Sequence, residues 1–522
     1  MSSSSPCPTQ HAVKQPAPYQ MCSQHECEER QRTGEVSIWE RTDRDRHTDT
    51  AQAYSQSHSQ SNQRPSDSRY HGRSGRGRGR KSVRGRFQGQ RHDDNHTYHR
   101  QQKAPPSCRH VSIDPCRAVQ KYRRSAAGTE TPLTRSPKDL LVTVDYLLQL
   151  LVQFRRDQEP QNKQHQHLLQ QYSFASLVEF WENRVRAVQV DWVKLQHHST
   201  DHRQCQARLV RAHILILYIM MSSSEYQQAN SSAKNNRNTQ ESSVSSYEAS
   251  FGKRALATAL AQFWKSPSSN GDTTDSEQNA TTISLDKLMD EMLVYDALQQ
   301  IQTMVAQGEI TIHAQFLESY HHHILLVAQE AVTDASSPRF PGFQWILDNL
   351  IPSLVNGNWA RILSQFSRAE PPPQFSSRTW ILVKCMWAPT LSTVRWKALQ
   401  TYNTTWMKGE SVQVCHVAEL LHISDEAHAL AWIETCGLPL ITSKNTDGDG
   451  PSSSEQKVVL KAQPIQPWDS VCTKKQSFWN TRLDDAMVFG TADGFWMDPQ
   501  GIRLPPTSTL ELLLLSDDND YE

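Results

Sequence analysis

The chain has 522 residues, with 55 Lys and Arg against 55 Asp and Glu, which gives a formal net charge of +0 at pH 7. Formal neutrality excludes attraction to nucleic acid or to a membrane through overall charge, so only local charge clusters can direct such binding. A hydrophobic content of 37% is low for a packed protein of this length and predicts that some segments are disordered.

The amino-terminal sequence predicts no secretory signal. Residues 1–20 are polar and lack the apolar stretch of a signal peptide. The longest apolar run, residues 214–221, is far shorter than the roughly 20 residues that a bilayer requires. The 10 cysteines show no paired spacing, which fits a reducing compartment. We therefore expect a nuclear or cytoplasmic protein without membrane contact.

The first hundred residues are predicted to contain little regular structure. Residues 1–20 are rich in Ser, Pro and Gln, a short motif occupies residues 21–41, and residues 42–106 are polar with almost no aliphatic side chains. Segments of this composition cannot bury enough apolar surface to offset the chain entropy lost on folding. We therefore predict disorder on both sides of the short motif.

An Arg-Gly tract lies within the second polar segment, over residues 70–87. Gly gives the backbone freedom, and Arg contacts phosphates and stacks on bases, so the tract is a candidate for non-specific binding of single-stranded RNA. A solvated linker or a localisation signal is the alternative interpretation. The candidate RNA-binding residues in the tract are Arg73, Arg76, Arg78, Arg80, Lys81, Arg84 and Arg86.

A helical period dominates residues 111–366. Apolar residues between Leu140 and Leu151 recur at the spacing of one helix face, and Ser136 and Pro137 form a helix start signal. An unbroken spacing of three or four predicts a long helix over residues 174–195. Further helices are predicted over residues 209–221, 255–264, 285–304, 314–331, 345–356 and 359–366. The polar interruptions over residues 222–250 and 266–282 are predicted to be surface loops.

The pattern changes near residue 386. Helices are predicted over residues 394–407, 417–421 and 425–435, with short strands near residues 412–414 and 458–460 and a loop over 442–456. This is the order of elements in a winged helix, which we assign to residues 386–465. Residues 466–522 show no clear period and form an extension with an acidic tail.

Several short blocks occur in a fixed order along the chain. They are residues 21–40, 118–128, 140–148, 183–191, 211–214, 290–295 and 356–361. In this order they resemble the blocks of the Sac-three/GANP family, whose members are helical scaffolds of messenger-RNA export complexes. The chain departs from the family pattern at Asn183, Gln189 and Ala212, where Asp, Arg and Phe are usual.

The resemblance implies a mainly α fold. A helical-repeat superhelix of the PCI/TPR-like type would occupy residues 107–385 and end in the winged helix. It also implies pairing with a second PCI-domain protein that carries a small acidic Dss/Sem-type subunit, and contact with RNA. The expected location is nuclear, including the nuclear envelope. The sequence shows no Phe-Gly repeats and no centrin-binding helix and resembles a short member of the family. Such members are associated with centrosomes and spindles, so a cytoplasmic or centrosomal role in cell division is the alternative.

The resemblance also suggests site residues within the helical domain. Candidates for RNA contact are Lys121, Arg123 and Arg124, and candidates for partner contact are Arg184, Arg186, Asp191, Asn358, Trp359 and Arg361. The alternative for these side chains is a solvated helix face with local ion pairs, each worth about 0.3–0.5 kcal/mol.

The sequence gives little support to metal binding or catalysis. Cys22, His25 and Cys27 have no second Cys/His pair at finger-like spacing. The triplet His321–His323 lies on different faces of a predicted helix, and Asp447–Gly450 lacks the remaining ligands of a calcium loop. No nucleophile elbow, phosphate-binding Gly-Lys-Ser/Thr loop or His-Glu-x-x-His pair is present. We expect no enzymatic activity, cofactor, metal or small-molecule substrate.

Overall fold

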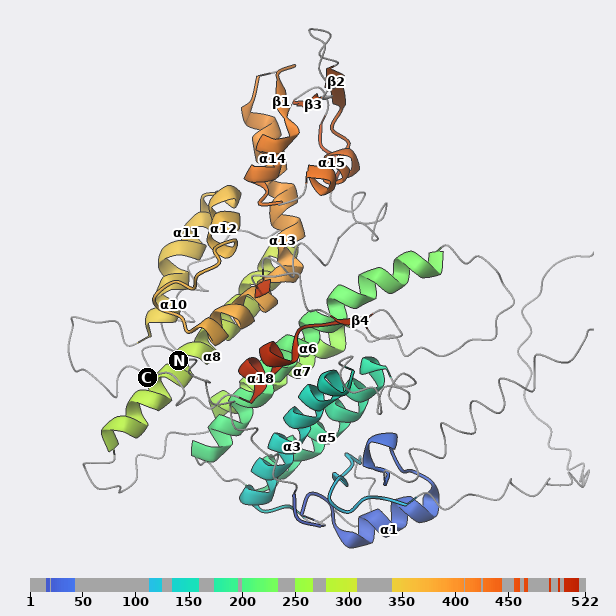
Figure 1. Ribbon diagram of the computed structural model, residues 1–522. Coiled ribbons are helices and arrows are strands. Elements are labelled where there is room, and N and C mark those ends of the chain that lie inside the picture. Colours follow the sequence, from blue (N-terminus) through green and yellow to red (C-terminus); the bar gives the residue numbers. More distant parts are fainter. Residues whose placement is uncertain are drawn as a thin grey trace, which may run out of the picture. The chain divides into compact units, whose positions relative to one another are not determined.

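The structure is a computed structural model, and it describes residues 16–18, 20–42, 112–123, 134–158, 173–195, 200–232, 249–265, 278–307, 340–407, 409–423, 426–443, 455–460, 464–467, 488–489, 496–497 and 502–515. The fold is mainly helical, as the sequence predicts (Figure 1). It divides into two compact units. The opening unit is Cys22–Ala118, and the helical unit is Met1–Met21 with Val119–Glu522. The Arg-Gly tract, the predicted helix over 314–331 and the acidic tail lie outside the described residues.

In its described residues, the opening unit contains an α-helix, α1 (Gln24–Thr33), and a 3-10 turn, η1 (Ile38–Glu40). The side chain of Ser23 accepts a hydrogen bond from the N–H of Glu26 and caps the start of α1. Gly34 follows the last turn with a φ of 74°, a left-handed conformation that Gly adopts without steric cost. The short motif therefore folds as a capped helix followed by a tight turn.

Residues 112–118 complete the opening unit. Arg41 forms a β-bridge with Ile113, and the N–H of Asp114 donates to the carbonyl of Glu40 at 2.8 Å. Ile113 and Ala118 share a small buried cluster with residues from α1 and the following turn. The structure thus groups residues 112–118 with the opening motif, whereas the predicted boundary at residue 107 assigns them to the helical domain.

In the part of the helical unit that the structure describes, long helices come first. Their bounds are Pro137–Asp157 for α3, Phe174–Leu195 for α5, Thr200–Ser232 for α6, Ala249–Lys265 for α7 and Gln278–Gln307 for α8. The start of α3 is confirmed, because Ser136 accepts a hydrogen bond from the N–H of Asp139 and Pro137 occupies the first turn. The predicted loops are shorter than expected, since α6 continues beyond Met221 and α8 begins before Leu285.

A second layer of helices packs on α8. It consists of α10 (Pro341–Trp345), the π-helical turn η2 (Ile346–Leu350), α11 (Ile351–Val355), α12 (Trp359–Phe366) and α13 (Ser377–Thr405). Aromatic rings fill the contact between α12 and α13. Phe366 stacks on Trp380 and Trp387, with ring centroids 5.7 Å and 5.0 Å away. This aromatic core fixes the position of the exposed side of α12.

The first half of α13 was not predicted. Its sequence is apolar on most sides and contains Pro389, which normally ends a helix. The helix continues because the disturbed turn has other support: the side-chain amide of Gln302 on α8 donates to the carbonyl of Met386. Residues 377–393 therefore form a buried helix that joins the two layers.

A small sheet follows α13. Its strands are β1 (Ser411–Gln413), β2 (Leu440–Ser443) and β3 (Glu455–Val459), paired antiparallel in the order β1-β3-β2. Two short helices, α14 (Val414–Leu420) and α15 (Glu426–Thr435), lie between β1 and β2 in the sequence. The predicted short helices are confirmed, and β2 is an additional strand that the sequence did not indicate.

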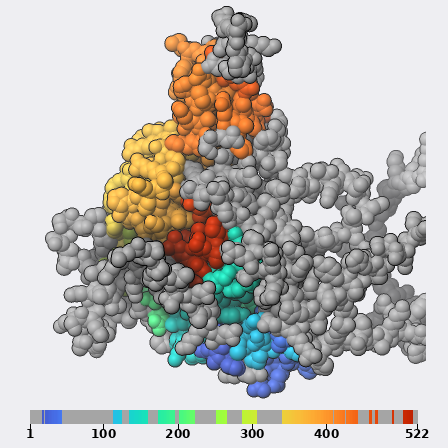
Figure 2. Space-filling model, in the orientation of Figure 1, coloured from blue at the N-terminus to red at the C-terminus, as the bar shows by residue number. Residues whose placement is uncertain are grey.

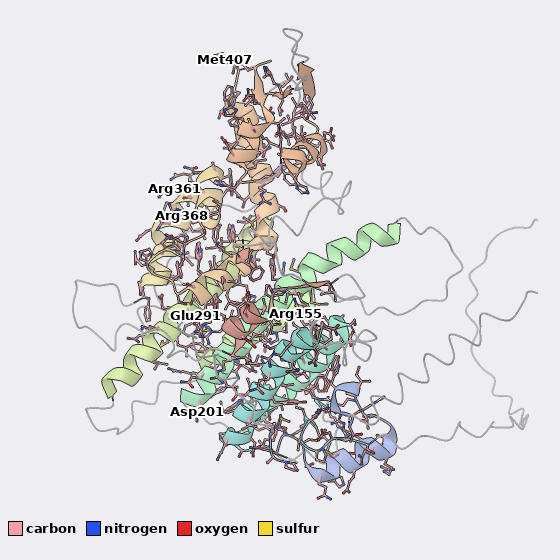
Figure 3. The ribbon with its side chains drawn as sticks, in the orientation of Figure 1. Arg155, Asp201, Glu291, Arg361, Arg368 and Met407 are labelled. Carbon is pink, nitrogen blue, oxygen red and sulfur yellow. The ribbon has the colours of Figure 1, made fainter. Side chains whose placement is uncertain are left out.

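The carboxyl-terminal extension returns to the first helices of the unit. The short strands β4 (Trp496–Met497) and β5 (Arg503–Leu504) pair, and α18 (Thr507–Leu514) packs on α3 and α6. The red surface of α18 lies beside the teal surface of α3 in the space-filling view (Figure 2). Arg155 at the end of α3 donates to the carbonyl of Pro505 at 3.2 Å (Figure 3). The structure therefore shows short strands and a helix in a segment whose sequence has no clear period.

Among the described residues, the structure contains no helix that is both long enough and apolar enough to cross a membrane.

Candidate nucleic-acid interface

The basic segment 119–123 lies along α5. The backbone N–H of Gln120 donates to the carbonyl of Met21 at 3.0 Å. The N–H of Tyr122 donates to Oδ1 of Asn183 at 3.2 Å. Because the backbone is held at both points, the side chains of this segment have defined directions. Lys121 and Tyr122 are half-buried, and Arg123 is exposed.

Arg186 projects from the exposed side of α5, between two aromatic rings. Its guanidinium carbon lies 5.1 Å from the ring centroid of Tyr122 and 5.7 Å from that of Phe251. Tyr122 belongs to the basic segment and Phe251 to the first turn of α7, so three parts of the chain meet at this arginine. We call the surface formed by Lys121, Tyr122, Arg123, Arg186 and Phe251 the basic-aromatic surface.

Two other residues predicted on this helix face the interior. Arg184 is 4% exposed, its guanidinium carbon lies 4.6 Å from the ring centroid of Phe180, and it donates to Asn183 at 2.7 Å. Asp191 is 1% exposed and forms an ion pair of 2.8 Å with Arg135. Positions seven apart share one side of a helix, and this side packs inward. Partner contact by Arg184 or Asp191 stays a prediction, and it would require either side chain to leave these contacts.

The remaining RNA-binding candidates have no structural description. Arg73, Arg76, Arg78, Arg80, Lys81, Arg84, Arg86 and Arg124 all lie outside the described residues. Their role in RNA binding stays a prediction from the sequence.

The other predicted partner residues lie at the start of α12. Asn358 is exposed, and its Oδ1 accepts a hydrogen bond of 3.1 Å from the N–H of Arg361, which caps the helix. Trp359 is buried, with the ammonium group of Lys397 5.5 Å from its ring centroid. Arg361 is exposed on the outer side of α12 (Figure 3). Of these three, Asn358 and Arg361 are accessible to a partner, and Val355 adds an exposed apolar side chain nearby in sequence.

An acidic group next to the basic-aromatic surface affects its charge. Burial raises the pKa of the Glu182 carboxyl to about 7, and the guanidinium of Arg186 opposes part of this rise. Oε1 of Glu182 is buried and lacks a hydrogen-bond partner within the described part of the chain. A carboxyl with this pKa is only partly ionised near neutral pH, so it neutralises Arg186 incompletely.

Replacing Glu182 by Gln is expected to change the pH dependence of stability. The folded chain holds a proton on Glu182 that the unfolded chain releases near its ordinary pKa of 4.5, so stability falls as pH rises from about 4.5 to about 7. The Gln variant lacks this loss and should be more stable than the wild type at pH 8, by roughly 1–3 kcal/mol, and similar to it at pH 4.5. Thermal unfolding at both pH values measures the difference.

A matched substitution controls this prediction. Glu419 is exposed on α14, so Glu419→Gln should leave the pH dependence unchanged. An equal gain in stability at both pH values for Glu182→Gln would contradict the inference that the folded chain holds a proton on Glu182.

The cysteines of the opening motif form a thiol pair. Cys22 and Cys27 are both buried, and a hydrogen bond between their side chains lowers the pKa of Cys27 and raises that of Cys22. Within the described ranges, no three His, Cys, Asp or Glu side chains gather in a way that would hold a metal ion. Both cysteines belong to the buried cluster of the opening unit, so their side chains contribute to its packing.

The sequence did not indicate the aromatic part of the surface. Tyr122 lies in the basic segment, but nothing in the spacing links it to Phe251, which follows it in the chain only after the helices α3, α5 and α6. Only the packing of α7 beside α5 and α6 brings the rings to the same arginine. The sequence offered one indication of an aromatic contribution, namely that Tyr122 stands between Lys121 and Arg123.

Residues 89–251 match the family model described as the SAC3/GANP family. The match includes the basic segment, Arg135 and the whole of α5, and its last residue is Phe251, so every residue of the basic-aromatic surface falls within it. It supports membership of the chain in this family, which is associated with a scaffold role in mRNA export. The blocks over residues 290–295 and 356–361 lie beyond the match. No curated protein matches the chain.

Proposed function

We propose, since the chain is a member of the SAC3/GANP family, that it is a non-enzymatic scaffold of a nuclear, transcription-coupled mRNA export or processing complex. One observation carries the proposal: the family match spans the segment whose basic and aromatic side chains gather on one exposed surface. A scaffold of this kind holds RNA and a partner protein together and has no reaction of its own.

The second part of the proposal is a helical-repeat domain of the PCI type that ends in a winged helix. The layered helices α3 to α13 support the first element. The second is supported by the two helices α14 and α15, followed by a sheet in the order β1-β3-β2. In this proposal the winged helix and the exposed side of α12 bind a second PCI-domain protein, which carries a small acidic Dss/Sem-type subunit.

The third part is direct binding of single-stranded RNA without sequence preference. Lys121, Arg123 and Arg186 supply positive charge on the helical unit, and the Arg-Gly tract supplies a longer basic segment in the same chain. Contacts between Arg or Lys and phosphates give affinity that falls with salt. The tract and the structured surface would then bind one RNA strand together.

Purification of the tagged chain from cells, with and without ribonuclease, tests the scaffold role. We expect a second PCI-domain protein and a small acidic subunit to remain bound after ribonuclease treatment, since protein contacts hold them. The variant Arg361→Glu should reduce their recovery, whereas the same charge reversal at an exposed position of α1, Arg32→Glu, should not. Recovery of centrosomal or spindle proteins in place of a PCI-domain partner would contradict the export role and favour the cell-division alternative.

A further inference from the structure

In the basic-aromatic surface an arginine lies against two aromatic rings, an arrangement that binding through charge alone does not require. Arg186 is exposed, but its guanidinium is held by Tyr122 on one element and Phe251 on another. A long side chain at an exposed position normally samples many rotamers and loses that freedom on binding. Contact with two rings restricts Arg186 before any ligand binds, so less entropy is lost when it does.

The two rings are also partly accessible. Tyr122 and Phe251 are both half-buried, so part of each residue is accessible at the surface where the guanidinium of Arg186 lies near both rings. Bases of single-stranded RNA stack on aromatic rings and on the plane of Arg, and this stacking does not depend on the base. The bases of a duplex are already stacked within the helix and cannot reach such a surface.

We propose that Tyr122, Arg186 and Phe251 form a stacking site for a base of single-stranded RNA, with Lys121 and Arg123 positioned to contact the adjacent phosphates. This inference rests on the proposed RNA binding and specifies the part of the structured domain that performs it. It predicts discrimination between single strands and duplexes that the Arg-Gly tract, acting through charge, does not provide.

The chemistry of the surroundings is compatible with this site. Glu182 is the acidic group that faces Arg186, and its raised pKa leaves it partly protonated at neutral pH. An acidic peptide would gain from the same positive charge, but it would not require two rings around the arginine. The rings therefore favour a nucleic-acid base over a carboxylate ligand.

Fluorescence anisotropy with the full chain tests the proposal. The probes are a short labelled oligouridylate and the same strand annealed to oligoadenylate. The variants Tyr122→Leu and Phe251→Leu keep apolar volume but remove a ring. Each should weaken single-strand binding about fivefold or more and leave duplex binding and the salt dependence unchanged.

Substitutions of the arginine separate stacking from charge. Arg186→Gln removes a positive charge beside the bound strand as well as the stacking plane, so it should also lower the slope of log affinity against log salt, by at most about 0.7. Arg186→Lys should keep the slope but weaken single-strand binding, because the ammonium group has no plane to stack on. Arg32→Gln removes an exposed arginine of α1, outside the basic-aromatic surface, and should leave the discrimination between single strands and duplexes unchanged. Deleting residues 70–90 should increase the effect of each ring variant.

The outcomes are distinguishable. Ultraviolet cross-linking of the wild-type chain to oligouridylate should give adducts at Tyr122 or Phe251, which tests the site even if a Leu variant fails to fold. Ring variants that leave single-strand affinity unchanged, or that lower single-strand and duplex binding equally, would overturn the stacking site while RNA binding by the chain stands. A wild-type chain that binds neither probe would overturn the proposed RNA binding itself.

Discussion

Replacing Glu291 by Leu is expected to destabilise the helical unit by about 3–5 kcal/mol. Glu291 lies on α8, where Figure 3 shows it among the packed helices. It accepts two hydrogen bonds from Arg211 on α6, of 2.9 Å and 2.6 Å, and one of 2.7 Å from the hydroxyl of Tyr295. Both charged side chains are less than one tenth exposed. The substitution would therefore leave the Arg211 charge buried without its acceptor.

The direction of the Glu291 pKa shift agrees with this expectation. Burial acts to raise the pKa, but the charge and hydrogen bonds of Arg211, together with the charge of Arg378 and the hydrogen bond from Tyr295, hold the pKa below its ordinary value. A depressed carboxyl pKa contributes stability above the ordinary pKa, and this contribution is lost as pH falls through the depressed value. The stabilising effect of Glu291 is therefore fully present at neutral pH, where the variant should be compared.

A combined variant provides the control. Replacing Arg211 by Met together with Glu291→Leu and Tyr295→Phe removes every polar member of the triad, so no charge or hydroxyl of this group remains without its partner. Such apolar replacements of buried ion pairs are often close to neutral in stability. Urea unfolding monitored by circular dichroism should show a large loss for Glu291→Leu and recovery in the combined variant. A loss below about 1 kcal/mol for the single variant would contradict the role of the pair.

The helices with clear start signals and one apolar stripe could be predicted from the sequence. For α3 the cap at Ser136 and the spacing from Leu140 to Leu151 give both the start and the buried face. In α13 the residues around Trp387 are apolar on most sides, so no period marks a helix, and Pro389 points to an end that tertiary contacts prevent. A helix buried on several sides has no amphipathic signal to read.

The site was predictable only in part, because its geometry depends on contacts distant in sequence. The spacing of Arg184 and Asp191 correctly places them on one side of α5, but it does not tell which side packs inward. The pairing of Asp191 with Arg135 decides that, across 56 positions of sequence separation. Arg184 and Arg186 are the same residue type, two positions apart on α5, but Arg184 is buried and Arg186 is exposed. Only the structure distinguishes the arginine that supports the fold from the one available to a ligand.

The carboxyl-terminal helix shows a related limit. Its apolar residues Leu510, Leu513 and Leu514 follow a helical spacing, but eight residues are too few for a stable isolated helix. Packing on α3 supplies the stability, with Arg156 and Glu511 forming an ion pair across the contact. A short helix that depends on a surface from the other end of the chain cannot be identified from its own sequence.

Replacing Arg30 by Met is expected to unfold the opening unit while the helical unit stays folded. The side chains of Arg30 and Glu40 are both 0% exposed and form an ion pair between α1 and η1. Loss of one partner from a buried pair costs about 3–5 kcal/mol, because the remaining charge has no compensation. The described core of this unit is small, so few other contacts can offset that loss.

Hydrogen exchange measured by mass spectrometry resolves the two units in one experiment. In the Arg30→Met variant the amides of α1 and of residues 112–118 should lose protection, and those of α5 and α13 should keep it. Arg32→Met makes the same substitution at an exposed position of the same helix and should change neither. Adding Glu40→Met to Arg30→Met removes the uncompensated charge and should restore part of the protection. The idea that the ion pair holds the unit together fails if Arg30→Met leaves α1 protected, because removal of the Arg30 charge would then not destabilise the unit.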